Sequence, residues 1–456
     1  MTQEQGRSTL RERTTSKERA ALEDRVARIL EIARARGADS AEVAVSRSEG
    51  LAVNVRHGEV ETVEQTRDQG FSITVYLGRR KGSASTSDAS LAAIEATVAK
   101  ALNIARYMAE DPAAGLADAA LMPTGPLPDL DLDHPWGIDV GEAAELARIC
   151  EAAALGYDER ITNSDGSTTT SGRSCHAYGN SHGFIGSEVA TRHGLSVAVI
   201  AGRDGGMQRD YAFTVGRSAS ALEAVEAVGR RAGERTVAKL GARPVPTARV
   251  PVLFSHDVAA GLLGHLVSAI SGGNLYRRSS FLLDGLGQQL FPQRVQIEEW
   301  PHLLQGLGSA AFDSDGVATA PKHLVRDGVL SSYVLSAYSA RRLGLVTTGN
   351  AGGVHNLRIS DDGLDLPALI SRLGRGLLVT ELMGQGVNGV TGDYSRGAAG
   401  FWVENGQVSH PVQEVTVASN LRDMYRNLDA IGNDTLRPGN IVCGSLLIDG
   451  MTLSGS

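Results

Sequence analysis

The sequence has few of the residues that mark several classes of protein. Only three of its 456 residues are cysteines, Cys150, Cys175 and Cys443, and their scattered positions exclude a disulfide framework and a CxxC metal site. Aromatic residues make up only 5% of the chain, which leaves little stacking surface for bases or sugars. No hydrophobic run approaches the roughly 18 residues needed to span a bilayer, so a membrane role is not expected.

Positive charge is also scarce. The chain has 44 lysines and arginines against 52 aspartates and glutamates, a formal net charge of −8. Because neutralising phosphates requires a basic surface, this balance argues against direct nucleic-acid binding. The segment MTQEQGRSTLRERTTSKER lacks the apolar stretch of a secretory signal, and we therefore expect a cytoplasmic protein. At roughly 150 residues per domain, the length suggests two to four domains.

Glycine, in contrast, is abundant at 54 residues, which indicates many tight turns and strand ends. The first residues, 1–17, are polar and are expected to form a disordered tail. Thr15 and Glu18 have capping-box spacing, which predicts a helix that starts there and ends at Gly37. Period-two alternation follows across 41–77 and predicts half-buried strands in an antiparallel meander.

Later segments continue the mixture of helices and strands. Helical spacing predicts further helices at 91–102, around Leu146, near Arg217 and at 257–270. Asp327-Gly328 and Asn405-Gly406 lie between apolar segments and predict two-residue hairpins. The expected fold class is therefore α+β, with a helix and antiparallel-sheet region in two parts followed by a β-rich C-terminal domain. The expected divisions are a tail at 1–17, an α+β domain at 18–110, a linker at 111–136, a middle α/β region at 137–245 and the β-rich domain at 246–456.

The sequence contains no helical zinc-protease motif. No histidine is followed by glutamate, and no two histidines lie four or five residues apart. The nearest approach is His256-Asp257 with His265 on the predicted helix at 257–270. Their rings would lie about 13 Å apart along the helix axis and on different faces, so the two histidines cannot share one ion. Ordinary surface or core histidines are the better interpretation.

Two further patterns match motifs but lack the structural context of those motifs. Residues 384–389, GQGVNG, satisfy GxGxxG, but no helix is predicted after them, as a dinucleotide site requires. Residues 179–183, GNSHG, satisfy GxSxG, but a strand is predicted next, which favours a turn over a nucleophile elbow at Ser181. The remaining candidates have plainer interpretations: a core thiol at Cys443, a turn at Asp313 and Asp315, and a solvated basic patch at Arg277 and Arg278.

Several long strings point to one family. TELMGQGVNGVTGDYSRGAAGFWVENGQVSHPVQEVTVASNL at 380–421, HLVSAISGGNLYRRSSFLLDGLG at 265–287 and GNAGGVHNLRI at 349–359 resemble the TldD/PmbA family, and its PmbA (TldE) branch in particular. LSAYSARRLGL at 335–345 and DGGMQRDYAF at 204–213 extend the resemblance over nearly the whole chain. The resemblance implies a two-subunit metallopeptidase. In it the TldD-type chain carries HExxxH on a helix, and a cysteine from the C-terminal part completes the metal site.

The resemblance also implies that this chain lacks the motif. When Gly261-Leu262 is aligned with the Gly-Leu that follows HExxxH, Ser255 stands at the first His, His256 at the Glu and Ala260 at the second His. Both ligands and the base are therefore lost, and we expect no metal and no catalytic residue in this chain. The zinc is expected in the TldD-type partner, where it would activate a water while the motif Glu acts as the base.

The expected function is that of a PmbA/TldE-type subunit of a cytoplasmic zinc metallopeptidase. This chain, with no cofactor of its own, would support assembly and guide small unfolded or modified peptides, including labile antitoxins and bacteriocin precursors. Its implied partner is a TldD-type subunit, in a heterodimer or a larger assembly, and a homodimer in the absence of the partner stays open. Cys443 lies near the position of the TldD-type thiolate, but it is not expected to be a ligand.

The glycine-rich segment 384–400 would permit close approach of a peptide backbone, and peptidases often hold extended peptides by main-chain pairing at a sheet edge. We predict that this segment lines part of a shared substrate channel, and tightly packed turns are the alternative. The channel candidates are Gly384, Gly386, Asn388, Gly389, Asp393, Tyr394 and Arg396.

Two other functions stay open at this point. One is a regulatory or binding protein that acts without proteolysis, connected with DNA gyrase or antitoxins. The net charge of −8 argues against direct DNA contact in that role. The other is an independent hydrolase that uses Ser181 or His256.

Overall fold

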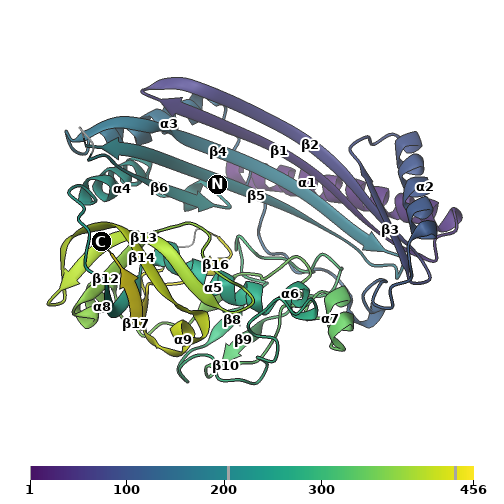
Figure 1. Ribbon diagram of the computed structural model, residues 1–456. Helices are drawn as coiled ribbons and strands as arrows, with labels where there is room; N and C mark the ends of the chain where they lie inside the picture. The colour runs from purple at the N-terminus through teal and green to yellow at the C-terminus, as the bar shows by residue number, and fades with distance from the viewer. Residues whose placement is uncertain (1, 203–205, 436–438, 456) are drawn as a thin grey trace.

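One antiparallel sheet of six strands dominates the N-terminal half, in the order β3-β2-β1-β4-β5-β6 (Figure 1). Its strands are β1 (Ser40–Arg56), β2 (Glu59–Leu77), β3 (Arg80–Thr86), β4 (Ile161–Asn180), β5 (Ile185–Ala201) and β6 (Gln208–Gly216). The computed structural model describes residues 2–202, 206–435 and 439–455. The meander β1-β2-β3 confirms the strands expected across 41–77. Because β1 also pairs with β4, the two predicted parts of this region share one sheet.

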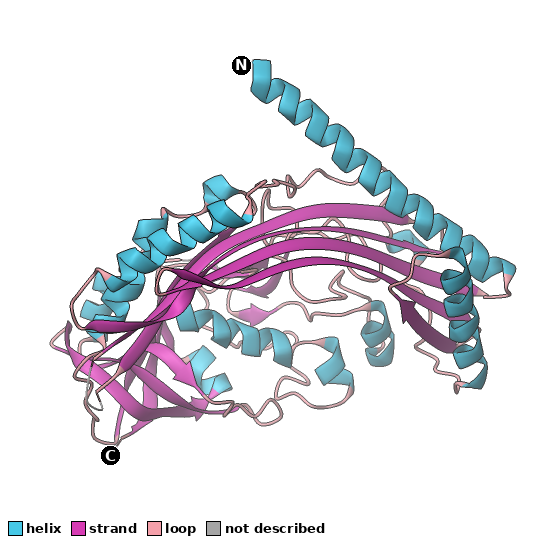
Figure 2. Ribbon diagram, turned by 90° about the horizontal axis from the view of Figure 1, so that it is seen from above, coloured by secondary structure: helices cyan, strands magenta, loops and turns pink. Residues whose placement is uncertain are grey.

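Four helices cover one face of this sheet (Figure 2): α1 (Thr2–Ala35), α2 (Leu91–Tyr107), α3 (Val140–Leu155) and α4 (Val225–Ala238). The apolar residues of β1 that meet the helices are odd-numbered, from Val43 to Val55, because successive side chains of a strand point to opposite faces. The even-numbered Ala44 belongs instead to the apolar cluster around Phe312 of the C-terminal domain. The sheet therefore separates the helices from the C-terminal domain, over which it arches in Figure 1.

The start of α1 differs from the prediction. The helix begins at Thr2, so the expected disordered tail is helical, and no capping box forms at Thr15. The side chains of that box bind elsewhere: Thr15 Oγ1 donates to Asp133 Oδ2 at 2.7 Å, and Glu18 pairs with Arg173 at 2.6 Å. Long-range partners have therefore replaced the local cap. Within the described residues, no helix combines the length and apolarity needed to cross a membrane.

The segment 111–136 packs against the protein at several points. It is coil apart from a short 3-10 turn at Ala119–Leu121. Leu130 and Leu132 are buried in the cluster around Phe312. The guanidinium of Arg341 donates to carbonyl oxygens of this segment, including that of Gly115 at 2.9 Å. The segment therefore holds the N-terminal sheet and the C-terminal domain together.

The buried side chain of Arg217 joins the sheet to the C-terminal domain. Its guanidinium donates to the carbonyl oxygens of Thr191 in β5 at 3.0 Å, Gly306 at 3.1 Å and Leu307 at 3.0 Å. The helix predicted near this arginine is displaced: α4 begins only at Val225. We attribute the displacement to the fixed position of Arg217, which holds the chain at the end of β6.

The C-terminal domain has two sheets and is rich in strands, as predicted. One sheet has the order β14-β13-β12-β7-β17-β15, and an additional pairing of β14 with β17 closes five of its strands into a barrel. Its strands are β7 (Ala248–Phe254), β12 (Gly376–Met383), β13 (Asp393–Glu404), β14 (Gln407–Asn420), β15 (Leu428–Ile431) and β17 (Leu446–Ser454). The other, in the order β10-β9-β8-β11-β16, comprises β8 (Ile297–Glu299), β9 (Lys322–Arg326), β10 (Val329–Leu330), β11 (Leu357–Ile359) and β16 (Ile441–Val442). Its helices are α5 (His256–Ala269), α6 (Gly272–Tyr276), α7 (Ala337–Leu343), α8 (Leu366–Leu373) and α9 (Leu421–Arg426).

Both predicted hairpins are confirmed. Asp327-Gly328 joins β9 to β10, and Asn405-Gly406 joins β13 to β14. All four residues have positive φ, between 51° and 74°, as a two-residue turn of this kind requires. The helix predicted at 257–270 is also confirmed as α5, whose leucines are buried in a core shared by the two C-terminal sheets.

Candidate functional site

The three positions aligned with HExxxH lie at the start of α5, where β7 runs directly into the helix. Ser255 is the N-cap residue, and its backbone amide donates to the carbonyl oxygen of Val379 in β12 at 2.9 Å. The hydroxyl of Ser255 is buried and makes no hydrogen bond among the described residues. Ala260 presents only a methyl group, which packs against the core. These two positions therefore carry no metal ligand.

His256 is held in place by carboxylates. Its Nδ1 lies 3.2 Å from Asp434 Oδ2, and its Nε2 lies 3.5 Å from Asp257 Oδ1. Ser445 completes the arrangement, because its hydroxyl donates to Asp434 Oδ2 at 2.6 Å and accepts from the His256 amide at 3.0 Å. Burial raises the pKa of Asp434, but the hydrogen bonds from His256 and Ser445 outweigh it and hold that pKa at about 2. The ring is therefore anchored on both sides.

The side chains around this point do not fit a zinc ion. A zinc site needs three or four ligands from His, Cys, Asp and Glu, and the described part of the chain contains no group of three placed to hold a metal. Cys443 is 2% exposed, and its thiol donates to the carbonyl oxygen of Gly444 at 3.0 Å. Because burial raises the pKa of this thiol, the thiolate that binds metals is disfavoured. Cys443 is a core residue, as predicted.

Replacing Asp434 with asparagine is expected to lower the free energy of unfolding at pH 7 by about 2 kcal/mol. The folded-state pKa of about 2 lies below the usual aspartate value, so the carboxylate stabilises the fold above roughly pH 4. That stabilisation is lost as the pH falls from about 4 to about 2. Urea unfolding of both proteins at several pH values tests this. Asp449→Asn, at an exposed position, is the control, and a difference that stays constant down to pH 2 would contradict the prediction.

The structure places the channel candidates in and after the connection between β12 and β13. The Asn388 amide donates to the carbonyl oxygen of Asp393 at 2.8 Å, and the Asn388 side chain accepts from two amides of its own turn. The carbonyl of Gly386 accepts from the Ser395 amide, and a Cβ at Gly386 would lie 1.7 Å from the Ser395 oxygen. A Cβ at Gly389 would meet nothing within 4 Å. Much of the backbone of this hairpin is therefore paired within itself.

The remaining channel candidates have different surroundings. A Cβ at Gly384 would meet nothing within 4 Å, and Asp393 is exposed. Tyr394 is 1% exposed, and Arg396 is half-buried on the same face of β13. The channel role of all seven residues stays a prediction.

The other candidate residues lie apart from α5 or face away from its start. Ser181 lies in the turn between β4 and β5, where its hydroxyl accepts from the Ala41 amide at 2.6 Å. Within the described residues no histidine ring forms a hydrogen bond with this hydroxyl, which supports the turn interpretation over a nucleophile elbow. The ring of His265 packs edge-on against Tyr394 at a centroid distance of 6.0 Å. His265 therefore does not join His256.

The structure also shows the environment of the turn at FDSDG and of the basic patch. The carboxylate of Asp313 accepts from three backbone amides, including those of Val317 at 3.0 Å and Ala351 at 2.9 Å. It thus closes a turn, as predicted. Arg277 and Arg278 are exposed, which agrees with a solvated patch.

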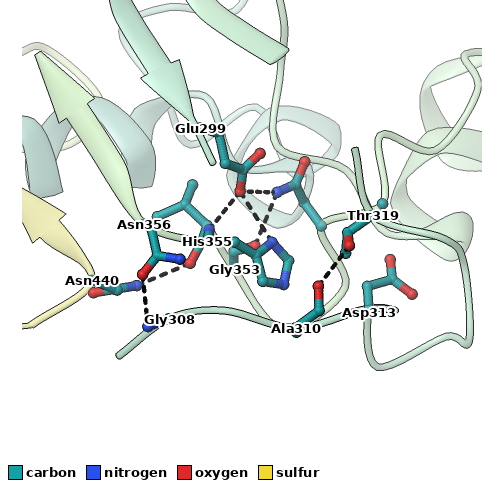
Figure 3. Close-up of polar contacts among 12 residues, drawn as sticks. Glu299, Gly308, Ala310, Asp313, Thr319, Gly353, His355, Asn356 and Asn440 are labelled. Atoms are coloured by element: carbon teal, nitrogen blue, oxygen red, sulfur yellow. Dashed lines mark hydrogen bonds and ion pairs between the residues drawn. The ribbon is translucent and has the colours of Figure 1, made fainter. Parts of the chain in front are cut away.

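A buried polar network centred on Glu299 was not predicted from the sequence (Figure 3). Its carboxylate accepts from the His355 backbone amide at 2.5 Å and from the Asn350 side-chain amide at 2.8 Å, and it pairs with Lys322 at 3.2 Å. Next to His355 in the chain, the Asn356 side chain accepts from the Gly308 amide at 2.9 Å. The string GNAGGVHNLRI supplies three of these residues, but its partners lie far away in the sequence.

The known proteins that are similar to this chain in sequence or in structure point to one family. Three family models, described as PmbA/TldA metallopeptidase domain 1, central domain and C-terminal domain, match residues 41–105, 133–240 and 247–455. Metalloprotease PmbA of Escherichia coli O157:H7 is 51% identical over 438 residues, which are 96% of this chain and 97% of that protein. A proposed modulator of DNA gyrase from Bacteroides thetaiotaomicron has a solved structure with a TM-score of 0.90 and 28% identity, covering 95% of this chain and 98% of that chain. TldE from Thermococcus kodakarensis has a TM-score of 0.84 at 19% identity, covering 94% and 100%, and shows the shared fold alone.

Proposed function

We propose, from the premise that this chain belongs to the PmbA/TldD family of metallopeptidases, that it is the non-catalytic PmbA/TldE-type subunit of a cytoplasmic peptidase. The observation that carries the proposal is the chemistry at the start of α5. By the resemblance, α5 corresponds to the helix that bears the motif in TldD-type chains, but Ser255 and Ala260 offer no ligand. His256 stands in place of the base and is held by Asp434.

The proposed partner is a TldD-type chain that holds the zinc. This chain would supply the second half of the assembly and guide small unfolded or modified peptides toward the partner. Main-chain pairing with an extended peptide suits such substrates, because it requires little side-chain selectivity. Open space at Gly384 and Gly389 supports a role for this connection in approaching a peptide backbone.

Reconstitution is expected to give peptidase activity only when both subunits are present. The experiment compares this chain alone, a TldD-type partner alone and their mixture, with cleavage of a fluorescein-labelled unfolded peptide and zinc content as the two measurements. We expect to find zinc only in the samples that contain the partner. A partner variant with its motif Glu replaced by Gln should lose more than about a hundredfold in activity in the mixture. His256→Gln in this chain should change that activity less than about threefold, because its ring is not the base.

Two outcomes would contradict the subunit proposal. Zinc in equimolar amount and cleavage by this chain alone would make it an independent hydrolase. If the partner cleaves the peptide at the same rate with and without this chain, a regulatory or binding role would be favoured. Such a role, modulation of DNA gyrase, has been proposed for the Bacteroides protein. Size-exclusion chromatography of the mixture decides separately whether the two chains associate.

A further inference from the structure

A cavity of about 380 Å³ lies where one end of the N-terminal sheet meets the C-terminal barrel. β6 and α4 line it from one side, and α5, β12 and β13 line it from the other; these elements are neighbours in Figure 1. Four cationic and three acidic side chains line the cavity. The lining includes Arg396, one of the channel candidates.

Two of the cations are neutralised within the cavity. Lys239 Nζ lies 2.9 Å from Asp210 Oδ2 and 2.7 Å from Glu381 Oε2. Arg235 Nη1 lies 2.5 Å from Asp257 Oδ2, and its Nε lies 3.4 Å from Asp210 Oδ1. All three acidic groups of the cavity are therefore engaged by these two side chains.

Arg396 differs from the other cations of the cavity. Arg209 pairs with Asp165, which is not part of the lining. Within the described residues no carboxylate lies at ion-pair distance from Arg396, and its Nε is buried without a hydrogen-bond partner. Its neighbour is the neutral hydroxyl of Tyr394: burial raises the pKa of Tyr394 to about 12, and the guanidinium opposes that rise. Arg396 is therefore the lining cation for which the described residues supply no acidic partner.

Thr380 supplies a second group without a partner. The pairing of β12 with β13 shifts register between Val379 and Glu381, so Thr380 lies at a bulge, and bulges redirect side chains. Its hydroxyl oxygen is buried, makes no hydrogen bond among the described residues, and belongs to the lining together with Arg396. The Nε of Arg235 also makes no hydrogen bond within the described part of the chain, but it lies 3.4 Å from Asp210 Oδ1. Because buried polar groups without partners are costly, the Thr380 hydroxyl and the Arg396 Nε point to a ligand that satisfies both.

We propose that this cavity is a binding site for a carboxylate, supplied by the C-terminal end of a peptide. The planar guanidinium of Arg396 donates to the carboxylate oxygens, and the Thr380 hydroxyl donates a further hydrogen bond. One carboxylate matches the single charge of Arg396, the lining cation for which the described residues supply no acidic partner. This inference depends on the proposed function in one respect only, which is that a peptide is the source of the carboxylate.

The cavity has room for the end of a chain. A Cβ at Gly261 of α5 would meet nothing within 4 Å, so the helix leaves space where a side chain would otherwise stand. Val258 and Leu382 provide apolar contacts for a terminal side chain. The volume lies within the usual range of small-ligand pockets, about 300–1,000 Å³.

Fluorescence anisotropy with the full-length chain tests the proposal without the partner and without catalysis. The probes are two N-terminally fluorescein-labelled hexapeptides of the sequence Gly-Ser-Ala-Gly-Ser-Ala, one with a free C-terminal carboxylate and one with a C-terminal amide. We expect the acid to bind at least tenfold more tightly than the amide. Arg396→Gln should abolish this preference, and Thr380→Val should weaken binding of the acid severalfold. Arg426→Gln, an equal change of charge at an exposed position, should preserve the preference.

Filling the cavity gives an independent test. Gly261→Leu should reduce binding of the acid more than tenfold, whereas Gly264→Leu on the same helix should not, although a Cβ at Gly264 also meets nothing within 4 Å. Thermal unfolding midpoints establish that each variant is folded. Equal affinity for acid and amide, or a preference that survives Arg396→Gln, would overturn the proposal. Displacement of the acid peptide by unlabelled N-acetylalanine at matching concentration would assign the site to small free carboxylates and overturn the peptide source.

Discussion

Replacing Glu299 with glutamine is expected to lower the free energy of unfolding by about 3 kcal/mol, as when a buried ion pair loses one partner. Glu299 is fully buried, and its carboxylate joins Lys322, His355 and Asn350. Burial raises the pKa of Glu299, but His355 and Lys322 outweigh it and keep that pKa below its usual value, so the group is charged in the fold. Glutamine keeps the shape and removes the charge, which leaves Lys322 without its counter-ion.

Urea unfolding followed by circular dichroism measures this loss. The matched control is Glu298→Gln, one residue earlier in β8, where the carboxylate is 32% exposed and pairs with His323 at 2.9 Å. Because exposed ion pairs contribute little, the control should lose less than about 1 kcal/mol. Similar losses for the two variants would mean that the buried charge of Glu299 is not what stabilises the network.

Gly400→Ala in β13 is expected to destabilise the protein by about 3 kcal/mol or more, the upper range for overpacking. A Cβ at Gly400 would lie 1.9 Å from the carbonyl oxygen of Leu378 and 3.0 Å from the Cα of Val379. Both obstacles belong to the backbone of β12, so no side-chain rotation can relieve the contact. The two strands would have to separate inside the barrel.

Gly397→Ala on the same strand is the control, because its Cβ would meet Met383 Cβ at 3.4 Å, an ordinary contact. We expect a change of less than about 1 kcal/mol there, since alanine in a strand costs less conformational entropy than glycine. Equal unfolding midpoints in urea for the two variants would show that the strands yield easily at Gly400. The predicted loss of stability at Gly400 would show that this glycine is needed for strand packing. The channel prediction would then apply to positions with open space, such as Gly384 and Gly389.

The sequence was informative where structure depends on neighbouring residues. Asp327-Gly328 and Asn405-Gly406 predict their hairpins because the positive φ that the turn needs is a local property of Asn, Asp and Gly. The helix α5 follows from its apolar spacing in the same way. Local patterns failed where a distant partner intervenes: the capping box expected at Thr15 does not form, since Thr15 binds Asp133.

Prediction from the sequence has the same limit at the candidate site. The loss of HExxxH at Ser255, His256 and Ala260 is visible from the sequence by resemblance alone. The residue that anchors His256, however, is Asp434, which lies 178 positions away. Likewise, His355 lies 56 positions from Glu299. Such pairs are decided by the packing of strands from different parts of the chain, and no periodicity in the sequence reports them.

The pairing of β1 with β4 has a consequence for how the protein is made. Residues 42–55 of β1 find their β4 partners only at 167–180, after the whole of 111–136 has been synthesised. Until the ribosome has released β4, the growing chain carries β1 with one side of its backbone unpaired and with an apolar row at Val43, Val45, Val53 and Val55. An exposed strand edge of this kind recruits other chains. Expression of the protein therefore depends on keeping nascent chains apart during this interval, and a fragment that ends before β4 is expected to aggregate.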